Sequence, residues 1–238
     1  MARRWLDESF LGRSLWHIVP RDHQQSDSSL RRRQITTVVV VIVGAIVLGI
    51  SIRIEPGSPW FYPSSVALAA VWAVGAFASG PLHLGRIASI TGDDHRRPVI
   101  QPILLGLAMA GVFVAGALIV RQIEPLAAQV GNVLKFATEG SLPILAVITI
   151  LNGIAEELFF RGAAYAAITR RPVLWTTVAY TVATAATGNI MLSFAAALLG
   201  VVVGLQRRAS GGILAPILTH CTWSMAMLLL LPVIFGLR

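Results

Sequence analysis

Residues 141–171 decide the fold of this chain, and they read SLPILAVITILNGIAEELFFRGAAYAAITRR. Apart from charged residues near its middle, the run is apolar and exceeds the ~20 residues that a helix needs to cross ~30 Å of hydrocarbon. Ser141 is a plausible N-cap, Pro143 falls in the first turn, where proline is tolerated, and Arg170-Arg171 end the run. The stretch therefore predicts a membrane-spanning helix that carries charges at mid-depth.

The composition of the whole chain also indicates a membrane protein. Of its 238 residues, 55% are hydrophobic and only 13% are charged, whereas soluble domains carry about 25% charged residues. Together the apolar runs predict an all-α fold, a polytopic membrane helix bundle with about seven transmembrane helices. The runs lie at about 35–52, 60–80, 99–120, 141–169, 173–206 (two short helices that meet at Gly188-Asn189) and 213–231.

Three regions follow from this pattern. Residues 1–33 are polar, hold seven of the 19 basic residues and predict a cytoplasmic basic N-terminal arm. Residues 34–140 predict three transmembrane helices followed by a polar connection over 122–140, in which a short interfacial helix is one alternative. Residues 141–238 predict a core that contains the charged helix and a last helix with a histidine.

The basic residues lie in short clusters beside apolar runs, which is how membrane orientation is encoded. Residues 1–33, 81–98, 170–171 and 207–208 hold seven, three, two and two of the 19 basic residues. These segments share one side if the N-terminus is cytoplasmic and the C-terminus external. The pattern predicts an integral plasma (cytoplasmic) membrane protein whose partner is membrane lipid. No nucleic-acid-binding motif accompanies the formal charge of +8, so no nucleic-acid partner is predicted.

Three charges at mid-helix would cost about 8–10 kcal/mol to insert before any pairing. Glu157 and Arg161 are four residues apart on one helical face and can neutralise each other. Glu156 points away from Arg161 and shares its face with Asn152, so we expect Glu156 to face a polar cavity. The alternative is that all three charges only hold the bundle together.

Other polar residues lie inside predicted spans at comparable depths. His220 is the only histidine within any predicted span, and Ser224 lies four residues later on the same face. Asn189 lies at the break between two short helices. Because an unpaired polar group in hydrocarbon costs several kcal/mol, we expect Glu156, Asn189, His220 and Ser224 to share one cavity that opens towards the cytoplasm.

The element Glu156-Glu157-x-x-x-Arg161-Gly162 in a membrane helix, with His220 about 60 residues later, resembles the CPBP family of intramembrane proteases. These are CAAX-processing and bacteriocin-processing enzymes, and the resemblance covers about residues 141–230. It implies an endopeptidase that acts on membrane-associated peptides or proteins. In the family, the glutamate that matches Glu156 is taken to activate water.

The resemblance also implies roles for the last helix, and it has two departures. His220 and Ser224 would bind the oxyanion of the tetrahedral intermediate, although the family has asparagine or aspartate where Ser224 stands. The second family motif, F-x-x-x-H, is absent, and Gly188 or Asn189 stands where its histidine is expected. Asparagine can position a water through hydrogen bonds but cannot take its proton.

The family is often labelled a metalloprotease, which would imply a divalent metal. A catalytic zinc normally has three protein ligands, and His220 with glutamates is too poor a set for tight zinc, so we predict no metal ligands and leave the cofactor open. The rival hypothesis is a catalytically attenuated relative that acts as a membrane binding, immunity or assembly protein. A transporter would predict repeated halves, and we find no internal repeat.

Overall fold

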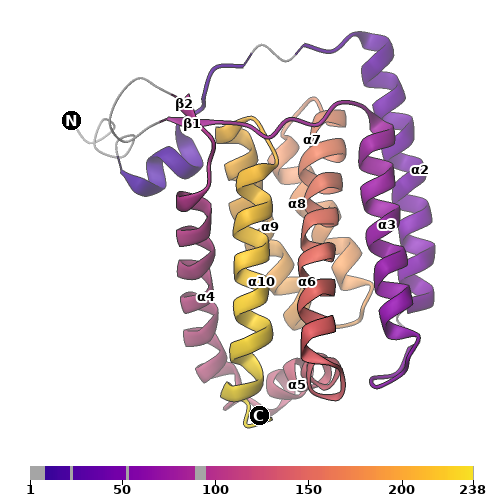
Figure 1. The fold of residues 1–238 in the computed structure, drawn as a ribbon, viewed down its shortest axis with the longest axis vertical. Helices are drawn as coiled ribbons and strands as arrows, with labels where there is room; N and C mark the ends of the chain where they lie inside the picture. Colours follow the sequence, from indigo (N-terminus) through magenta and orange to yellow (C-terminus); the bar gives the residue numbers. More distant parts are fainter. Residues whose placement is uncertain (1–8, 22–23, 52–53, 89–94, 238) are drawn as a thin grey trace.

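The computed structural model describes residues 9–21, 24–51, 54–88 and 95–237. Nearly all of its regular structure is helical, apart from a short antiparallel ladder in which β1 (Ile87–Ala88) pairs with β2 (His95–Arg96). The helices are η1 (Gly12–Trp16), α2 (Asp27–Ser51), α3 (Phe61–Ser79), α4 (Ile100–Val120), α5 (Glu124–Glu139), α6 (Leu142–Glu157), η2 (Leu158–Ala164), α7 (Tyr165–Ala167), α8 (Pro172–Ala185), α9 (Ile190–Ser210) and α10 (Leu214–Ile234) (Figure 1).

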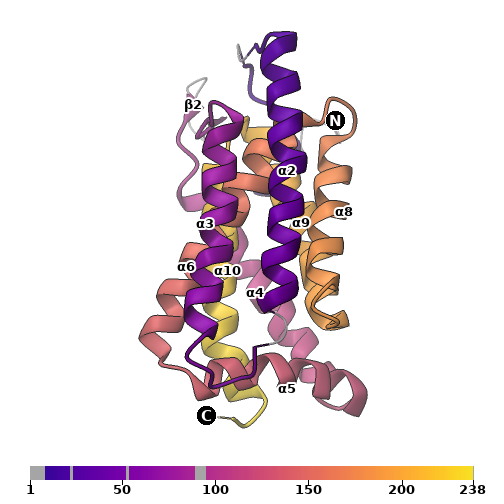
Figure 2. The ribbon, with the colours of Figure 1, turned by 90° about the vertical axis from the view of Figure 1, so that its right-hand side faces the viewer.

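Six helical segments of the described chain are long and apolar enough to cross a membrane. They are α2, α3, α4, the continuous segment 142–167, α9 and α10. The 14-residue α8 is shorter and packs along α9 (Figure 2). The prediction of an all-α polytopic bundle is confirmed, and α8 is the short seventh helix of the predicted set.

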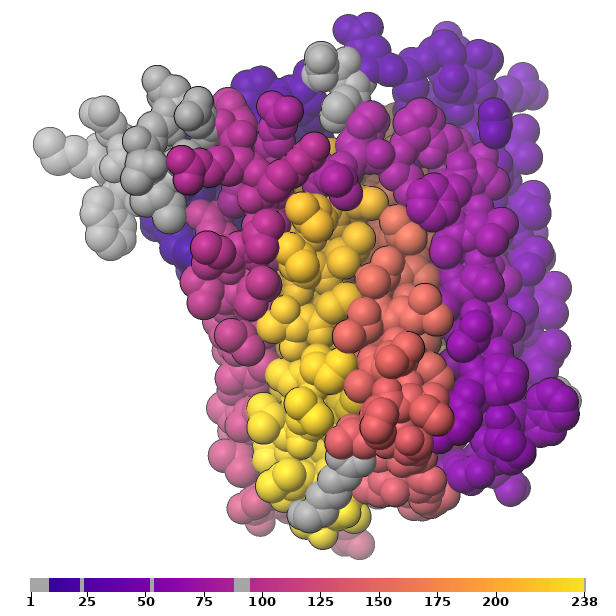
Figure 3. Space-filling view, in the orientation of Figure 1, coloured from indigo at the N-terminus to yellow at the C-terminus, as the bar shows by residue number. Residues whose placement is uncertain are grey.

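In the packed bundle α6 lies between α3 and α10 (Figure 3). It contacts α3 and α10, while α10 also contacts α4 and α9. In the space-filling view α10 and α6 lie side by side, flanked by α4 and α3 (Figure 3). At one end α5 lies across the bundle (Figures 1 and 2). This packing brings the predicted charged helix and the predicted histidine helix into direct contact.

Most of the basic residues in the described part of the chain lie at the opposite end from α5, in loops and at helix ends (Figure 1). The chain before α2, the β1–β2 region, the connection from α7 to α8 and the turn between α9 and α10 all lie there (Figure 1). Like charges that are far apart in sequence therefore share one end of the bundle. This is the grouping on which the predicted orientation depends.

The predicted boundary between the N-terminal arm and the first helix differs from the observed elements. Helix α2 begins at Asp27, so the boundary predicted at residues 33/34 falls inside a helix. Part of the N-terminal arm is also ordered, because η1 packs against α9 and the Val19 backbone N–H donates to the Ala209 carbonyl at 3.1 Å. The connection over 122–140 takes the helical alternative and forms α5.

The turn between α9 and α10 pairs with the chain that follows α3. The Ile213 backbone N–H donates to the His83 carbonyl at 2.9 Å, and the Arg86 N–H donates to the Ser210 carbonyl at 2.9 Å. Gly212 lies at the point of closest approach. A Cβ atom there would overlap the backbone atoms of Gly85 and Leu84, and backbone cannot move aside as a side chain can.

Gly212→Ala is therefore expected to destabilise the protein by about 1–3 kcal/mol, as overpacked sites do. The measurement is the unfolding temperature of the purified protein in detergent. Gly111→Ala in α4 is the matched control, since a Cβ atom there would meet nothing within 4 Å and alanine is the better helix former. Equal unfolding temperatures for the two variants would contradict the close contact at Gly212.

Candidate active site

The charged helix does not continue as a regular α-helix to Thr169, as the sequence predicted. It changes to a π-helix, η2, directly after Glu157, and ends in the single turn α7. The Arg161 carbonyl within this wider turn accepts a hydrogen bond of 2.6 Å from Arg207 Nε of α9. Segments of π-helix are rare and frequently occur at functional sites.

Glu157 and Arg161 form the predicted pair. Arg161 Nη1 lies 3.0 Å from Glu157 Oε1, and both side chains are fully buried. The guanidinium also lies over the Tyr180 ring, with Cζ 4.8 Å from the ring centroid, and donates to the Gly200 carbonyl at 3.4 Å. Gly200 lets the two helices approach closely here, because a Cβ atom on it would already lie 3.0 Å from Thr177 Cγ2 and 3.4 Å from Arg161 Nη2.

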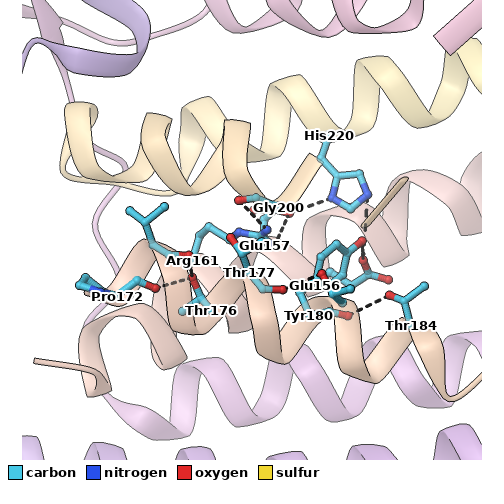
Figure 4. A network of polar contacts seen from close by, with 12 residues as sticks. Glu156, Glu157, Arg161, Pro172, Thr176, Thr177, Tyr180, Thr184, Gly200 and His220 are labelled. Carbon is cyan, nitrogen blue, oxygen red and sulfur yellow. Dashed lines mark hydrogen bonds and ion pairs between the residues drawn. The ribbon is translucent and has the colours of Figure 1, made fainter. Parts of the chain in front are cut away.

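His220 contacts both glutamates from α10 (Figure 4). Its Nδ1 lies 2.8 Å from Glu157 Oε1, and its Nε2 lies 4.0 Å from Glu156 Oε2. The contact with Glu157 corrects the expected division of roles, in which Glu157 served only Arg161. A carboxylate hydrogen-bonded to one ring nitrogen fixes the orientation of an imidazole and the direction of its other nitrogen.

Glu156 has the more accessible carboxylate of the pair. Its side chain is 23% exposed, whereas that of Glu157 is 0% exposed. The Tyr180 hydroxyl of α8 donates to Glu156 Oε2 at 2.6 Å (Figure 4). Asn152, predicted to support the site, is half-buried, and its side-chain amide donates to the Ile148 carbonyl of its own helix at 3.0 Å.

Tyr180 was missed by the sequence analysis. It is the only tyrosine in the apolar stretch 173–206, and a phenol inside a membrane bundle needs a hydrogen-bond partner. This requirement could have marked Tyr180 as a residue of the polar site. Its partner could not be identified from the sequence, because the sequence does not tell which face of α8 meets α6.

Aromatic rings surround the polar group. Phe160 lies between Trp72 and Tyr180, with ring-centroid distances of 5.4 and 5.1 Å. On the other side His220 lies 6.3 Å from Tyr180 and 6.2 Å from Trp223. This apolar enclosure strengthens the electrostatic interactions within the group by lowering the local dielectric constant.

Asn189 does not join this group, which corrects the expectation of one shared cavity. Its Oδ1 accepts from the Leu192 backbone N–H at 3.0 Å and caps α9, and its Nδ2 donates to the Gln129 carbonyl of α5 at 2.7 Å. It lines an apolar cavity of about 350 Å³ together with Trp223. Asparagine is a favoured N-cap residue, and this role engages both polar atoms of the side chain.

Ser224 lies one turn beyond His220 on α10 and is half-buried. In the part of the chain that the structure describes, no hydrogen bond links it to Glu156 or His220. Its role as an oxyanion donor therefore stays a prediction.

The residues at the site do not fit a zinc centre. Within the described ranges, no three His, Cys, Asp or Glu side chains are grouped so that they could hold a metal ion. Glu157 Oε1, which a metal would need, already contacts both Arg161 and His220. We therefore derive no chemical step through a metal.

Residues 138–226 match the model of a family described as type II CAAX prenyl endopeptidase Rce1-like. The match confirms the resemblance to CPBP intramembrane proteases, and it contains Glu156, Glu157, Arg161 and His220. The matched family is described as one of CAAX-type endopeptidases. Comparisons with curated proteins and with solved structures gave no significant match.

Proposed function

We propose that this protein is a glutamate-dependent intramembrane endopeptidase that cleaves membrane-associated peptides or proteins near the cytoplasmic leaflet. The proposal depends mainly on the position of the Glu156 carboxylate. Its carboxylate is partly accessible, accepts the Tyr180 hydroxyl at 2.6 Å and has His220 Nε2 at 4.0 Å. A distance of 4.0 Å is too long for a hydrogen bond, but it is short enough for one water molecule beside the two groups to bond to both.

In the proposed reaction Glu156 takes a proton from water, and the resulting hydroxide attacks the scissile carbonyl carbon. The protonated Glu156 then gives its proton to the leaving amine as the C–N bond breaks. Such general acid–base catalysis contributes typically about 10²–10⁴-fold to the rate. Tyr180 holds the carboxylate in place during both proton transfers.

His220 stabilises the oxyanion that forms during the attack. Its Nδ1–H is donated to Glu157, so Nε2 is the nitrogen that faces Glu156 and the substrate. In the imidazolium form Nε2 carries a proton and can donate a hydrogen bond to the oxyanion. Glu157 and Arg161 act as positioning residues, because they orient His220 without facing the substrate.

The test is a cleavage assay with the purified full chain in proteoliposomes. The family description suggests one probe, a prenylated peptide that ends in a CAAX sequence. An unmodified transmembrane peptide is the second probe. Mass spectrometry should find an internal cleavage in at least one of them, and no cleavage when Glu156 is replaced by glutamine.

The second candidate function is a binding, immunity or assembly protein without catalysis. The observation that favours it is Asn189, which stands where a family histidine is expected and is engaged as a helix cap. A folded protein that retains these peptides in a pull-down but never cleaves them would support this function and end the proposed enzyme activity.

We expect the N-terminus to be cytoplasmic and the C-terminus external, so that the basic end of the bundle faces the cytoplasm. Cysteines introduced as Ser26→Cys and Leu237→Cys, in a Cys221→Ser background, can be labelled in intact cells with a membrane-impermeant maleimide. Only the cysteine at 237 should react before the cells are lysed. Labelling of both from outside would contradict the proposed topology.

Tyr180→Phe is expected to lower kcat by about 10–100-fold, because a hydrogen bond to a charged group contributes about 1.5–3 kcal/mol. The aromatic contacts with Phe160 would remain, so the unfolding temperature should change little. Tyr165→Phe is the matched control, since Tyr165 stacks on Arg207 at 4.9 Å and has no contact with Glu156. An equal loss of activity in both variants would show that the Tyr180 hydroxyl has no specific role.

A further inference from the structure

A second polar cavity lies at the basic end of the bundle, apart from the glutamate site. It measures about 400 Å³ and is enclosed by α2, the end of α3, the segment η2–α7 and the end of α9. Pockets for small molecules typically measure about 300–1,000 Å³. Neither Glu156 nor His220 lines it, so the proposed catalysis leaves this cavity without a role.

The described lining of the cavity is strongly basic. Arg21, Arg32, Arg33 and Arg207 line it, and no Asp or Glu is among the described residues that do so. Three of these arginines come from the N-terminal arm and α2, and Arg207 comes from α9, which is far along the chain from them. Four guanidinium groups around one space repel each other unless an anion lies between them.

Two of these arginines are buried with unsatisfied donors. Arg33 is 6% exposed and Arg207 is 7% exposed. Arg33 donates from Nη2 to the Pro81 carbonyl at 3.1 Å, but its Nε and Nη1 have no partner. Arg207 donates from Nε to the Arg161 carbonyl, but its Nη1 has no partner. A buried donor without a partner costs about 1–3 kcal/mol, and more when it is charged.

The fold holds both side chains firmly at this place. Arg33 is held by its hydrogen bond to the Pro81 carbonyl, and the absence of a side chain on Gly80, whose φ is +136°, leaves room for the Arg33 guanidinium. Arg207 stacks on the Tyr165 ring, with Cζ 4.9 Å from the centroid. The two guanidinium groups are thus fixed in advance, which lowers the entropy that a ligand would lose on binding them.

We infer that this cavity binds a phosphate group carried by a small molecule or a lipid. Phosphate offers several acceptor oxygens and up to two negative charges, and the arginine fork matches its geometry. Ser26 and Ser29 also line the cavity and can donate hydroxyl hydrogen bonds. The same chemistry could come from the headgroup of an anionic phospholipid, which lies at this level of a membrane, or from a soluble phosphate.

Two probes distinguish these sources. Inorganic phosphate is titrated into the detergent-purified full chain, and the unfolding temperature is followed at constant ionic strength. In parallel, the chain is reconstituted in nanodiscs of phosphatidylglycerol or phosphatidylcholine, and native mass spectrometry counts the lipids it retains. Saturable stabilisation by phosphate alone assigns a soluble ligand, and selective retention of phosphatidylglycerol assigns a lipid headgroup.

Arg32→Gln and Arg31→Gln form a matched pair of variants. Both arginines are exposed and adjacent on α2, but only Arg32 lines the cavity. Arg32→Gln is expected to weaken the binding by several-fold, and Arg31→Gln to leave it unchanged. Arg33→Gln and Arg207→Gln should weaken it by about tenfold or more, since each removes a charged hydrogen-bond donor. If Arg33→Gln and Arg207→Gln fail to fold, the comparison of Arg31→Gln with Arg32→Gln still tests the inference.

The inference is overturned if neither probe shows saturable binding to the wild-type chain. It is equally overturned if Arg31→Gln and Arg32→Gln weaken the binding to the same extent, because the effect would then come from general surface charge. Neither result depends on peptide cleavage, so the test stands apart from the proposed protease activity.

Discussion

Replacing Glu156 by glutamine is expected to reduce peptide cleavage by about 10²–10⁴-fold, the usual contribution of a general base. Glutamine keeps the size of the side chain and can still accept the Tyr180 hydroxyl, which lies 2.6 Å from Glu156 Oε2 in the wild-type chain. It cannot take a proton from water. The measurement is kcat/KM with the cleaved peptide, together with the unfolding temperature in detergent.

Glu139→Gln is the matched control for this variant. Glu139 is an exposed carboxylate at the end of α5, the helix that lies across one end of the bundle (Figure 1), and its loss should leave the cleavage rate unchanged. If Glu156→Gln keeps more than about a tenth of the wild-type activity, Glu156 is not the general base. If Glu139→Gln loses as much activity as Glu156→Gln, the effect is one of net charge.

The helix bundle could be predicted because membrane spans leave a strong signal in a single sequence. Apolar runs of about 20 residues and the basic clusters between them gave the helices and the two ends of the bundle. The ends of the helices leave a weaker signal in the sequence where polar residues continue a helix. Asp27 begins α2 several residues before the apolar run does, because the backbone hydrogen bonds of a helix do not require apolar side chains.

The site was predicted where helical spacing alone decides the contacts. Glu157 and Arg161 are four residues apart, and they pair at 3.0 Å. The contact of His220 with Glu157 depends on the packing of α10 against α6, which spacing does not give. The π-helix after Glu157 changes the backbone hydrogen bonds without a recognisable residue pattern, so the sequence indicated a regular helix instead.

Asn189 shows how a correct pattern can receive the wrong role. The break at Gly188-Asn189 was predicted and lies between α8 and α9. A polar residue inside a membrane was expected to seek the other polar residues. However, the first N–H groups of a helix are also unsatisfied and lie much closer in the chain. The Asn189 side chain satisfies one of them.

Arg161→Ala is expected to lower the free energy of unfolding by about 3–5 kcal/mol, because it removes the guanidinium that neutralises the buried Glu157 carboxylate and leaves it with His220 alone. Arg161 and Glu157 are both 0% exposed, and Glu157 Oε2 already lacks a hydrogen-bond partner. The measurement is equilibrium unfolding in mixed detergent. Arg121→Ala, at the exposed end of α4, should change the unfolding free energy by less than about 0.5 kcal/mol.

A double variant separates the cost of an unpaired charge from the loss of packing. Glu157→Gln combined with Arg161→Met leaves no buried charge unpaired, so it should be more stable than Arg161→Ala. Its cleavage rate should nevertheless be lower than that of the wild type, because glutamine orients His220 less firmly than the Glu157 carboxylate, which lies 2.8 Å from Nδ1. If Arg161→Ala folds as stably as the wild type and loses only activity, the pair does not stabilise the fold. Arg161 would then act in the reaction itself, and its proposed role as a positioning residue would be wrong.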